Sequence, residues 1–318
     1  VLILLAGSMV ITLNSAPAHA APGARKPLTK AQIMELLLDE VSSRRVAMLV
    51  EQRGIDFEPT EDDFRTLHRA GAQEVLLMAL RTARRVPPKE VVVRQHCDRA
   101  RQLEEKGGYT EAEREYRAAL ELDPGNAAVY SALGNVLVQQ GKWGSAVAAF
   151  RQAVRRNPDD AEAHFNLGAA FRAAGNLDGA MAEFREAARL KPDEAKAHER
   201  VGRLCAEKRD WKQAVVAYQA VVRLQADSSQ AHNNLGFALR NQGDLKGAIA
   251  AFQEAVRLQP GDAIAHNNLG FTLEEKGELQ AALEQYRIAS RLSPQDPAIR
   301  ANFEAVTRKL KRPSLVEQ

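Results

Sequence analysis

Three nine-residue stretches of this 318-residue chain decide its fold: AHFNLGAAF at residues 163–171, AHNNLGFAL at residues 231–239 and AHNNLGFTL at residues 265–273. Each lies in a 34-residue segment that recurs six times in one register. A small residue recurs at the same place in every copy, at Ala100, Gly134, Gly168, Gly202, Gly236 and Gly270. Twelve positions later comes an alanine, and four after that an aromatic residue, from Ala112 and Tyr116 in the first copy to Ala282 and Tyr286 in the last. Repeats of this length predict a solenoid with an extended concave surface.

Each repeat is predicted to be a pair of antiparallel helices. In residues 127–160 the apolar residues of the first helix recur at steps of three and four, which is the spacing of one helix face. Gly141 ends that helix, and Pro158 ends the second, because a proline disfavours the helical conformation in the residue before it. Gly134 lets the two helices approach closely at their crossing, and Phe150 is expected to fill the space beside it.

These motifs resemble the tetratricopeptide repeat family over residues 93–296, and are especially similar to the repeats of O-GlcNAc transferases and related bacterial proteins. The resemblance implies an all-α fold, a right-handed solenoid of six helix pairs. It does not extend to catalysis, because the sequence contains no Gly-rich phosphate loop and no CxxC, HExxH or GxSxG motif. The segments outside the repeats are also too short for a glycosyltransferase domain. We therefore expect a protein that is not an enzyme and that needs no cofactor.

The fourth repeat, residues 195–228, departs from the common pattern at two positions. Arg209 stands where the other repeats have the turn glycine, and Ala226 stands where most have the closing proline. Because glycine tolerates the left-handed conformation far better than other residues, these changes predict a local irregularity in this repeat.

The start of the sequence predicts export. Val1–Leu13 is an apolar run, and Ala18-His19-Ala20 has the small-x-small form of a cleavage site, so residues 1–20 are interpreted as a secretory signal peptide. The run is shorter than the roughly 20 residues that span a bilayer. The alternative is an uncleaved anchor. We expect an exported bacterial protein of the periplasm or cell envelope, with no stable membrane span after cleavage.

Two further segments flank the repeats. Residues 21–28 are rich in Ala, Pro and Gly and suggest a flexible linker, and residues 29–86 predict a small module of four short helices. Thr29 and Thr60 are expected to cap two of these helices. Residues 297–318 are predicted to form a capping helix and tail, with an apolar side that covers the open end of the last repeat.

Charge, cysteines and histidines exclude several kinds of site. The net charge of +3 is too small to suggest a nucleic-acid partner. Cys97 and Cys205 are three repeats apart, beyond the roughly 7 Å that a disulfide allows between Cα atoms, so both are expected to be buried thiols. One histidine recurs every 34 residues, at His164, His198, His232 and His266. Neighbouring copies would lie about 10 Å apart, whereas zinc ligands lie about 2 Å from one ion, so a packing role is expected and no metal site.

The first helices are expected to line the concave groove with their second, fifth, sixth, ninth and twelfth positions, which share one side. Asparagine recurs at the sixth position, at Asn166, Asn234, Asn268 and Asn302. Such a ladder of amides can hydrogen-bond an extended peptide backbone, as the resemblance to the O-GlcNAc transferase repeats implies. The alternative is that these asparagines only keep the repeat soluble.

A second pattern resembles the carboxylate clamp of tetratricopeptide domains that bind chaperone C-termini, which consists of Lys, Asn, Asn, Lys and Arg. Its register falls on Ser131, Asn135, Asn166, Lys196 and Arg200, so that four of the five types match. Further positive charge on the same face comes from Arg172, Arg203 and Arg240. These groups suit a carboxylate, so the partner predicted here is an acidic C-terminal tail. The alternative is an incidental basic patch in contact with solvent.

The sequence thus predicts a non-catalytic scaffold that binds an extended peptide or the tail of a protein partner in its groove. Two other functions stay open. One is an accessory subunit of an envelope enzyme complex. The other is a structural solenoid that self-associates by packing end to end.

Overall fold

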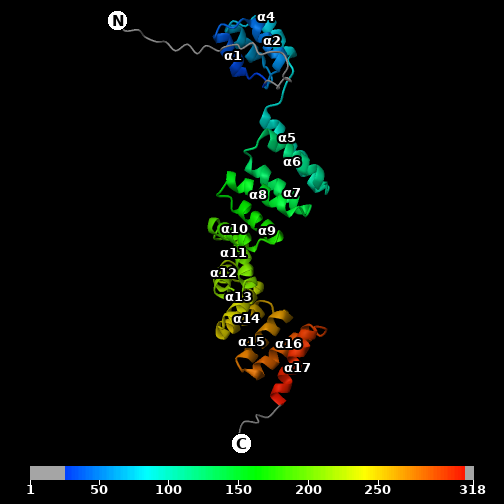
Figure 1. The fold of residues 1–318 in the computed structure, drawn as a ribbon, viewed down its shortest axis with the longest axis vertical. Helices are drawn as coiled ribbons and strands as arrows, with labels where there is room; N and C mark the ends of the chain where they lie inside the picture. Colours follow the sequence, from blue (N-terminus) through cyan, green and yellow to red (C-terminus); the bar gives the residue numbers. More distant parts are fainter. Residues whose placement is uncertain (1–25, 312–318) are drawn as a thin grey trace, which may run out of the picture. The chain divides into compact units, whose positions relative to one another are not determined.

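A computed structural model describes residues 26–311 of the chain. The predicted signal peptide, residues 21–25 of the predicted linker and the predicted tail beyond Lys311 lie outside the described residues. The chain divides into two compact units, Val1–Val92 and Val93–Gln318, which are called unit 1 and unit 2 below. Every extended regular element in the described part is a helix, which confirms the all-α class (Figure 1).

Unit 1 contains four short helices: α1 (Lys30–Leu38), α2 (Ser43–Arg53), α3 (Glu61–Arg69) and α4 (Glu74–Thr82). Thr29 and Thr60 cap α1 and α3 through capping boxes, which confirms both predicted caps. In the box of α3, the Asp63 carboxylate accepts a hydrogen bond of 2.9 Å from the N–H of Thr60. The same carboxylate forms an ion pair with Lys30, and this pair links the first turns of α1 and α3.

Leu28 belongs to the core of unit 1, although it lies in the stretch predicted as a flexible linker. Its side chain is 1% exposed and shares one apolar cluster with Ile33, Ile55 and Leu80. Its backbone forms a parallel bridge with Ile55, which forms a second bridge with Arg85. The packed part of unit 1 therefore includes the end of that stretch, because the apolar side chain of Leu28 is removed from water there.

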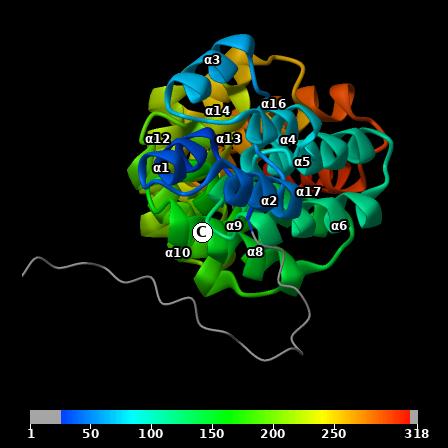
Figure 2. The same ribbon diagram turned by 90° about the horizontal axis from the view of Figure 1, so that it is seen from above.

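Unit 2 consists of six helix pairs and one further helix. The first helices of the pairs are α5 (Lys89–Glu105), α7 (Ala127–Gln139), α9 (Ala161–Ala173), α11 (Ala195–Glu207), α13 (Ser229–Gln242) and α15 (Ala263–Glu275). The second helices are α6 (Tyr109–Leu122), α8 (Trp143–Arg156), α10 (Leu177–Leu190), α12 (Trp211–Leu224), α14 (Leu245–Leu258) and α16 (Leu279–Leu292). From α6 onward each helix packs against the next. Seen from above, the second helices follow one another around a ring, so unit 2 winds as a superhelix (Figure 2).

The two helices of a pair meet where a glycine faces an aromatic ring. A Cβ atom on Gly134 would lie 2.6 Å from two ring carbons of Phe150, which is itself 1% exposed. The same contact recurs between Gly168 and Phe184, Gly202 and Tyr218, Gly236 and Phe252, and Gly270 and Tyr286. The sequence suggested that Phe150 lies beside the crossing. In the structure the ring lies directly on the glycine backbone, so the missing side chain makes room for the ring.

The predicted irregularity of the fourth repeat is wrong. Arg209 adopts the left-handed conformation itself, with φ of 58°, close to the 71° of Gly141 in the second repeat. The turn keeps its usual hydrogen bond, because the N–H of Asp210 donates to the carbonyl of Cys205 at 2.8 Å. Packing of α11 on α12 holds the turn in this conformation and offsets the local cost of a Cβ atom there, which is about 1–2 kcal/mol.

The last helix, α17 (Pro297–Lys311), covers the final pair. It packs against α15 and α16 and buries Ile299 and Val306. Asp296 caps it by accepting hydrogen bonds from the N–H groups of its second and third residues. Lys309 donates to Glu274 on α15 at 2.6 Å. The cap is thus joined to the last repeat by both apolar packing and charge.

Replacing Gly134 by alanine should destabilise the solenoid by about 1–3 kcal/mol, because the new methyl group overlaps the Phe150 ring. Urea denaturation followed by circular dichroism measures the effect. The matched control is Gly144→Ala in α8, where a Cβ atom meets nothing within 4 Å. That change should stabilise, since alanine is the better helix former. Equal effects of the two substitutions would contradict the assigned contact.

Arg209→Gly should stabilise the protein by about 0.5–1 kcal/mol, because it relieves the Cβ strain of a left-handed residue. The measurement is again the urea midpoint. Arg209→Ala removes the same charge but keeps the Cβ atom, so it should bring no comparable gain. A stabilisation by alanine as large as that by glycine would show that the backbone conformation is not the cause.

Unit 1 should lose stability in acid through Asp63. The hydrogen bond from Lys30 and that from the Thr60 backbone lower the pKa of Asp63 from 3.8 to about 2. Because the folded protein favours the ionised form of Asp63, this carboxylate stabilises the fold fully above pH 3.8. The contribution is lost as the pH falls through about 2, where the carboxylate becomes protonated in the folded protein as well. Asp63→Asn should therefore increase hydrogen exchange in peptides from residues 26–92 at pH 6. The difference from the parent protein, compared at equal pH, should shrink towards pH 2; a constant difference would exclude this linkage.

Candidate functional site

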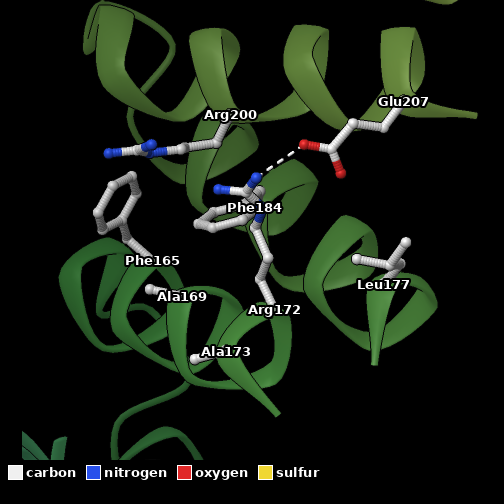
Figure 3. A pocket seen from close by; sticks show the side chains of 8 residues that line it. All are labelled: Phe165, Ala169, Arg172, Ala173, Leu177, Phe184, Arg200 and Glu207. Carbon is white, nitrogen blue, oxygen red and sulfur yellow. Dashed lines mark hydrogen bonds and ion pairs between the residues drawn. The ribbon is translucent and has the colours of Figure 1, made fainter. Parts of the chain in front are cut away.

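A recess of about 490 Å³ opens in unit 2 between α9, α10 and α11 (Figure 3). Its walls come from two consecutive repeats, so it exists only because the repeats stack. The residues that line it are Phe165, Ala169, Arg172, Ala173, Leu177, Phe184, Arg200 and Glu207. Phe165, Ala169 and Arg172 hold the fifth, ninth and twelfth positions of their repeat, which are positions predicted to face the groove.

Aromatic rings form one wall of this recess, and a guanidinium group faces them. The rings of Phe165 and Phe184 are tilted against each other with centroids 5.3 Å apart. Arg200 reaches from α11 toward Phe165 (Figure 3). A guanidinium group can bind a carboxylate through two parallel hydrogen bonds, and the neighbouring rings can cover the apolar part of the same ligand. The recess therefore suits an acidic group attached to an apolar stem.

Three cations of α11 lie on one side of that helix. Lys196, Arg200 and Arg203 follow one another at steps of four and three, which places them on one face. Within residues 26–311 no carboxylate forms an ion pair with any of them, whereas 16 other lysine and arginine side chains of that part lie within 4 Å of a carboxylate, from Lys30 with Asp63 to Lys309 with Glu274. The α11 cation cluster, as these three residues are called below, keeps its charge available for a ligand.

Two other arginines predicted for this site are already paired between repeats. Arg172 donates to Glu207 at 2.7 Å, as the dashed line in Figure 3 shows. Arg240 lies 3.6 Å from the carboxylate of Glu275. Exposed pairs of this kind contribute little stability, about 0–1 kcal/mol, but they reduce the charge that a ligand would meet. Sequence spacing alone could not show that these two arginines differ from Arg200.

The remaining clamp residues surround the recess without lining it. Asn166 is half-buried on α9 next to Phe165, and Lys196 lies one helical turn before Arg200 on α11. Asn135 is exposed on α7, which contacts α9. The side chains of Asn135 and Asn166 make no hydrogen bond within the described residues. The structure therefore brings Arg200 into the recess and leaves the two asparagines open beside it.

The asparagines of the ladder are partly bound by neighbouring side chains outside the ladder. Asn268 donates to the Asn233 side chain of the preceding repeat at 3.0 Å, and Asn302 donates to Asn267 at the same distance. Asn234 accepts from Gln230 at 2.8 Å. Each amide has two N–H donors and two acceptor lone pairs, so one contact leaves hydrogen-bonding capacity for a peptide. The ladder thus braces neighbouring repeats and still presents polar groups.

Sequence reasoning missed an aromatic pair on the last two repeats. Phe237 and Phe271 hold the ninth position of their first helices, where the third repeat has Ala169. They are 40% and 37% exposed. The guanidinium of Arg240 lies 5.5 Å from the ring centroid of Phe237 and 4.6 Å from that of Phe271. Large aromatic side chains left open on a groove are typical of binding sites, and their recurrence at one groove position could have revealed them.

The recurring histidines tie each first helix to the turn before it. The Nε2 atom of His164 lies 3.0 Å from the Pro158 carbonyl, and its Nδ1 atom lies 2.6 Å from Glu183. His266 makes the equivalent contacts, at 3.1 Å to Pro260 and 2.8 Å to Gln285. The role is structural, and it includes specific hydrogen bonds that the sequence did not indicate.

Burial affects two thiols and a phenol of the core. Cys97 and Cys205 are both free and buried, which confirms that prediction. Burial raises the pKa of both thiols, which disfavours the reactive thiolate. Burial also raises the pKa of the Tyr218 phenol to about 12. Residues 26–311 contain no group of three or more His, Cys, Asp or Glu side chains arranged to hold a metal ion.

None of the described helices has the length and apolar character needed to cross a membrane.

Comparisons with known proteins agree with this architecture. The sequence profile of the tetratricopeptide repeat family matches residues 131–195, 202–263 and 238–297, and a second profile of the same repeat matches residues 101–141. The sequence search of curated proteins gave no match. Many solved structures share the fold.

Three of these structures illustrate the likeness. YrrB, a TPR protein described as having an unusual peptide-binding site, is 23% identical, with a TM-score of 0.55 over 60% of this chain and 97% of its own. A double mutant of MamA RS-1 is 25% identical, with a TM-score of 0.50 over 54% of this chain and 97% of its own. PilF from Pseudomonas aeruginosa is 16% identical, with a TM-score of 0.52 over 70% of this chain and 99% of its own.

The profile matches cover more than half of the chain, and the stacked helix pairs with their glycine–aromatic contacts coincide with them. The chain belongs to the tetratricopeptide repeat family.

Proposed function

We propose that this protein is a non-catalytic scaffold that holds an extended segment of a protein partner in the groove of unit 2. The observation that carries the proposal is that Lys196, Arg200 and Arg203 form no ion pair within residues 26–311, beside a recess that Arg200 lines. Stacked helical repeats use their concave surfaces to bind other proteins, which supports the general role.

The partner segment is proposed to end in a carboxylate. Its terminal group would bind Arg200 and Lys196, and its last side chain would occupy the recess against Phe165. Asn135 and Asn166 would hydrogen-bond the backbone just before the terminus. Arg203 would attract further acidic residues of the segment.

The rest of the segment would continue along the groove over the last two repeats. Asn234 and Asn268 offer their remaining hydrogen-bonding capacity to its backbone. Phe237, Arg240 and Phe271 form a second contact, at which an apolar side chain of the partner could pack. Arg240 acts there mainly as part of this aromatic stack, because its charge is shared with Glu275.

The proposed location is the cell envelope of a bacterium. The support is the apolar run Val1–Leu13 followed by the small-x-small motif of Ala18 and Ala20. Sequencing of the N-terminus of the protein recovered from an envelope fraction tests this location.

Arg200→Ala should weaken the binding of an acidic peptide with a free C-terminus by 10-fold or more at low salt, because a charged hydrogen bond contributes about 1.5–3 kcal/mol. The loss should be smaller at high salt, where the open groove is screened. Fluorescence anisotropy with the labelled peptide and its C-terminally amidated twin gives both affinities. Ser131→Lys should strengthen binding, since it completes the clamp.

The matched control is Arg291→Ala, which removes one charge from a second helix and should change the affinity less than 2-fold. Equal affinities for the free and amidated peptides would exclude a carboxylate site and leave a general peptide-binding groove. An equal loss in Arg200→Ala and Arg291→Ala would show that only the overall charge matters.

A further inference from the structure

A second recess, of about 330 Å³, lies on the side of unit 2 formed by the second helices, between α10 and α12. It is called the outer pocket below. The helix α11 closes its floor through His198 and Val201. These two residues lie on the opposite side of α11 from Lys196 and Arg200, since a helix turns by about 100° per residue. The outer pocket is therefore separate from the groove.

His198 and Ala217 of the fourth repeat both line the outer pocket. In the third repeat Glu183 bonds the Nδ1 atom of His164 at 2.6 Å, and in the sixth Gln285 bonds that of His266. The corresponding residue of the fourth repeat is Ala217, so His198 has no such partner there. The fifth repeat has the same pair, His232 and Ala251, so the small side chain leaves room beside the histidine but does not by itself set the fourth repeat apart.

An apolar side chain stands at the edge of this space. Val216 is 56% exposed, the second-highest value among the large hydrophobic residues of unit 2. The same register position in the other repeats is never a large apolar residue: it holds Arg114, Ala148, Ala182, Ala250 and Glu284. An exposed valine at this one repeat is not required by the solenoid packing, which the other repeats achieve without it.

The rim of the outer pocket is cationic. Arg185, Arg189 and Arg223 line it together with His198, and no carboxylate lines it. Glu186 pairs with Arg189 at 2.6 Å, but neither Arg185 nor Arg223 forms an ion pair within the described residues. Two guanidinium groups without an ion-pair partner in the described residues therefore flank an apolar recess, and that of Arg185 also lies near the Cys205 thiol. A complementary ligand needs carboxylates around an aliphatic group.

We infer that the outer pocket is a second docking surface, for an acidic segment of a protein that inserts one aliphatic side chain against Val216 and Ala217. Its carboxylates bind Arg185 and Arg223. A recessed apolar point fits a single side chain of a protein, whereas adsorption to an anionic bilayer needs a broad apolar or basic face. Because the two sites lie on opposite sides of α11, one molecule can hold two partners at once.

The test uses an N-acetylated, C-terminally amidated probe of sequence Glu-Asp-Glu-Leu-Glu-Asp-Glu with a fluorescent label, and a twin with serine in place of leucine. The amidated end removes the carboxylate that the groove is proposed to bind. The double variant Arg185→Glu/Arg223→Glu should weaken binding of the leucine probe by 10-fold or more. Val216→Ser should weaken it by about 3-fold and should abolish the preference for leucine over serine.

The matched control is Arg155→Glu/Arg291→Glu, which reverses two unpaired arginines at the register of Arg223 in other repeats and should change the affinity less than 2-fold. The preference for the leucine probe over the serine probe should persist in Arg200→Ala and be lost in Val216→Ser, so failure of the groove proposal and failure of this one are distinguishable. Circular dichroism checks that each variant is folded.

Three outcomes would overturn the inference. One is no binding of the leucine probe by the parent protein up to millimolar concentration, or equal binding of the two probes. Another is an equal loss in both double variants, which would indicate charge alone. The third is a dependence on Arg223 seen with vesicles of phosphatidylglycerol and phosphatidylcholine but not with the peptide, which would make this face a membrane contact.

Discussion

The structure depends on the contact between an aromatic ring and a glycine backbone within each helix pair. Phe150 can lie on Gly134 only because no Cβ atom stands between them. This contact sets how closely the two helices approach, and with it the tilt of the pair. A pair alone buries too little apolar surface to be stable, so the repeats must stack, and the groove and the outer pocket arise between them. In the first repeat Ala100 takes the place of the glycine, and it is buried in the same apolar cluster as Tyr116.

Polar contacts between repeats refine this packing. Residues 35 positions apart meet repeatedly: Arg172 with Glu207, Asn268 with Asn233, and Lys309 with Glu274. In the first of these pairs the base lies on the earlier helix, α9, and the acid on the later helix, α11. In the last pair the order is reversed, with the acid on α15 and the base on α17. That reversal distinguishes α17 from a further repeat helix and favours its place at the end of the stack.

The fourth repeat differs from its neighbours on both sides. Toward the groove, α11 presents three cations that no carboxylate neutralises within residues 26–311. Toward the second helices, Val216 and Ala217 produce an apolar recess. It also holds Arg209 in a strained conformation where glycine would serve better. A repeat that keeps the packing contact of Gly202 with Tyr218 but differs from its neighbours at exposed positions such as Val216 and Arg203 is expected where binding, and not stability, decides the residues.

The sequence by itself determined the helix pairs of unit 2 and the helix caps at Thr29 and Thr60 in unit 1. These features follow from the local spacing of apolar residues and from glycine, proline and capping residues, which favour particular backbone conformations. The tertiary structure alone decided which charges are free. Arg172 and Arg200 are equally basic in sequence, yet only Arg172 meets a carboxylate, because its partner comes from the next repeat along the stack. It also decided that Arg209 could complete a regular turn, since packing of the flanking helices outweighs the local preference. Side-chain partners across a stack are set by geometry between repeats, and that geometry exists only once the repeats have packed.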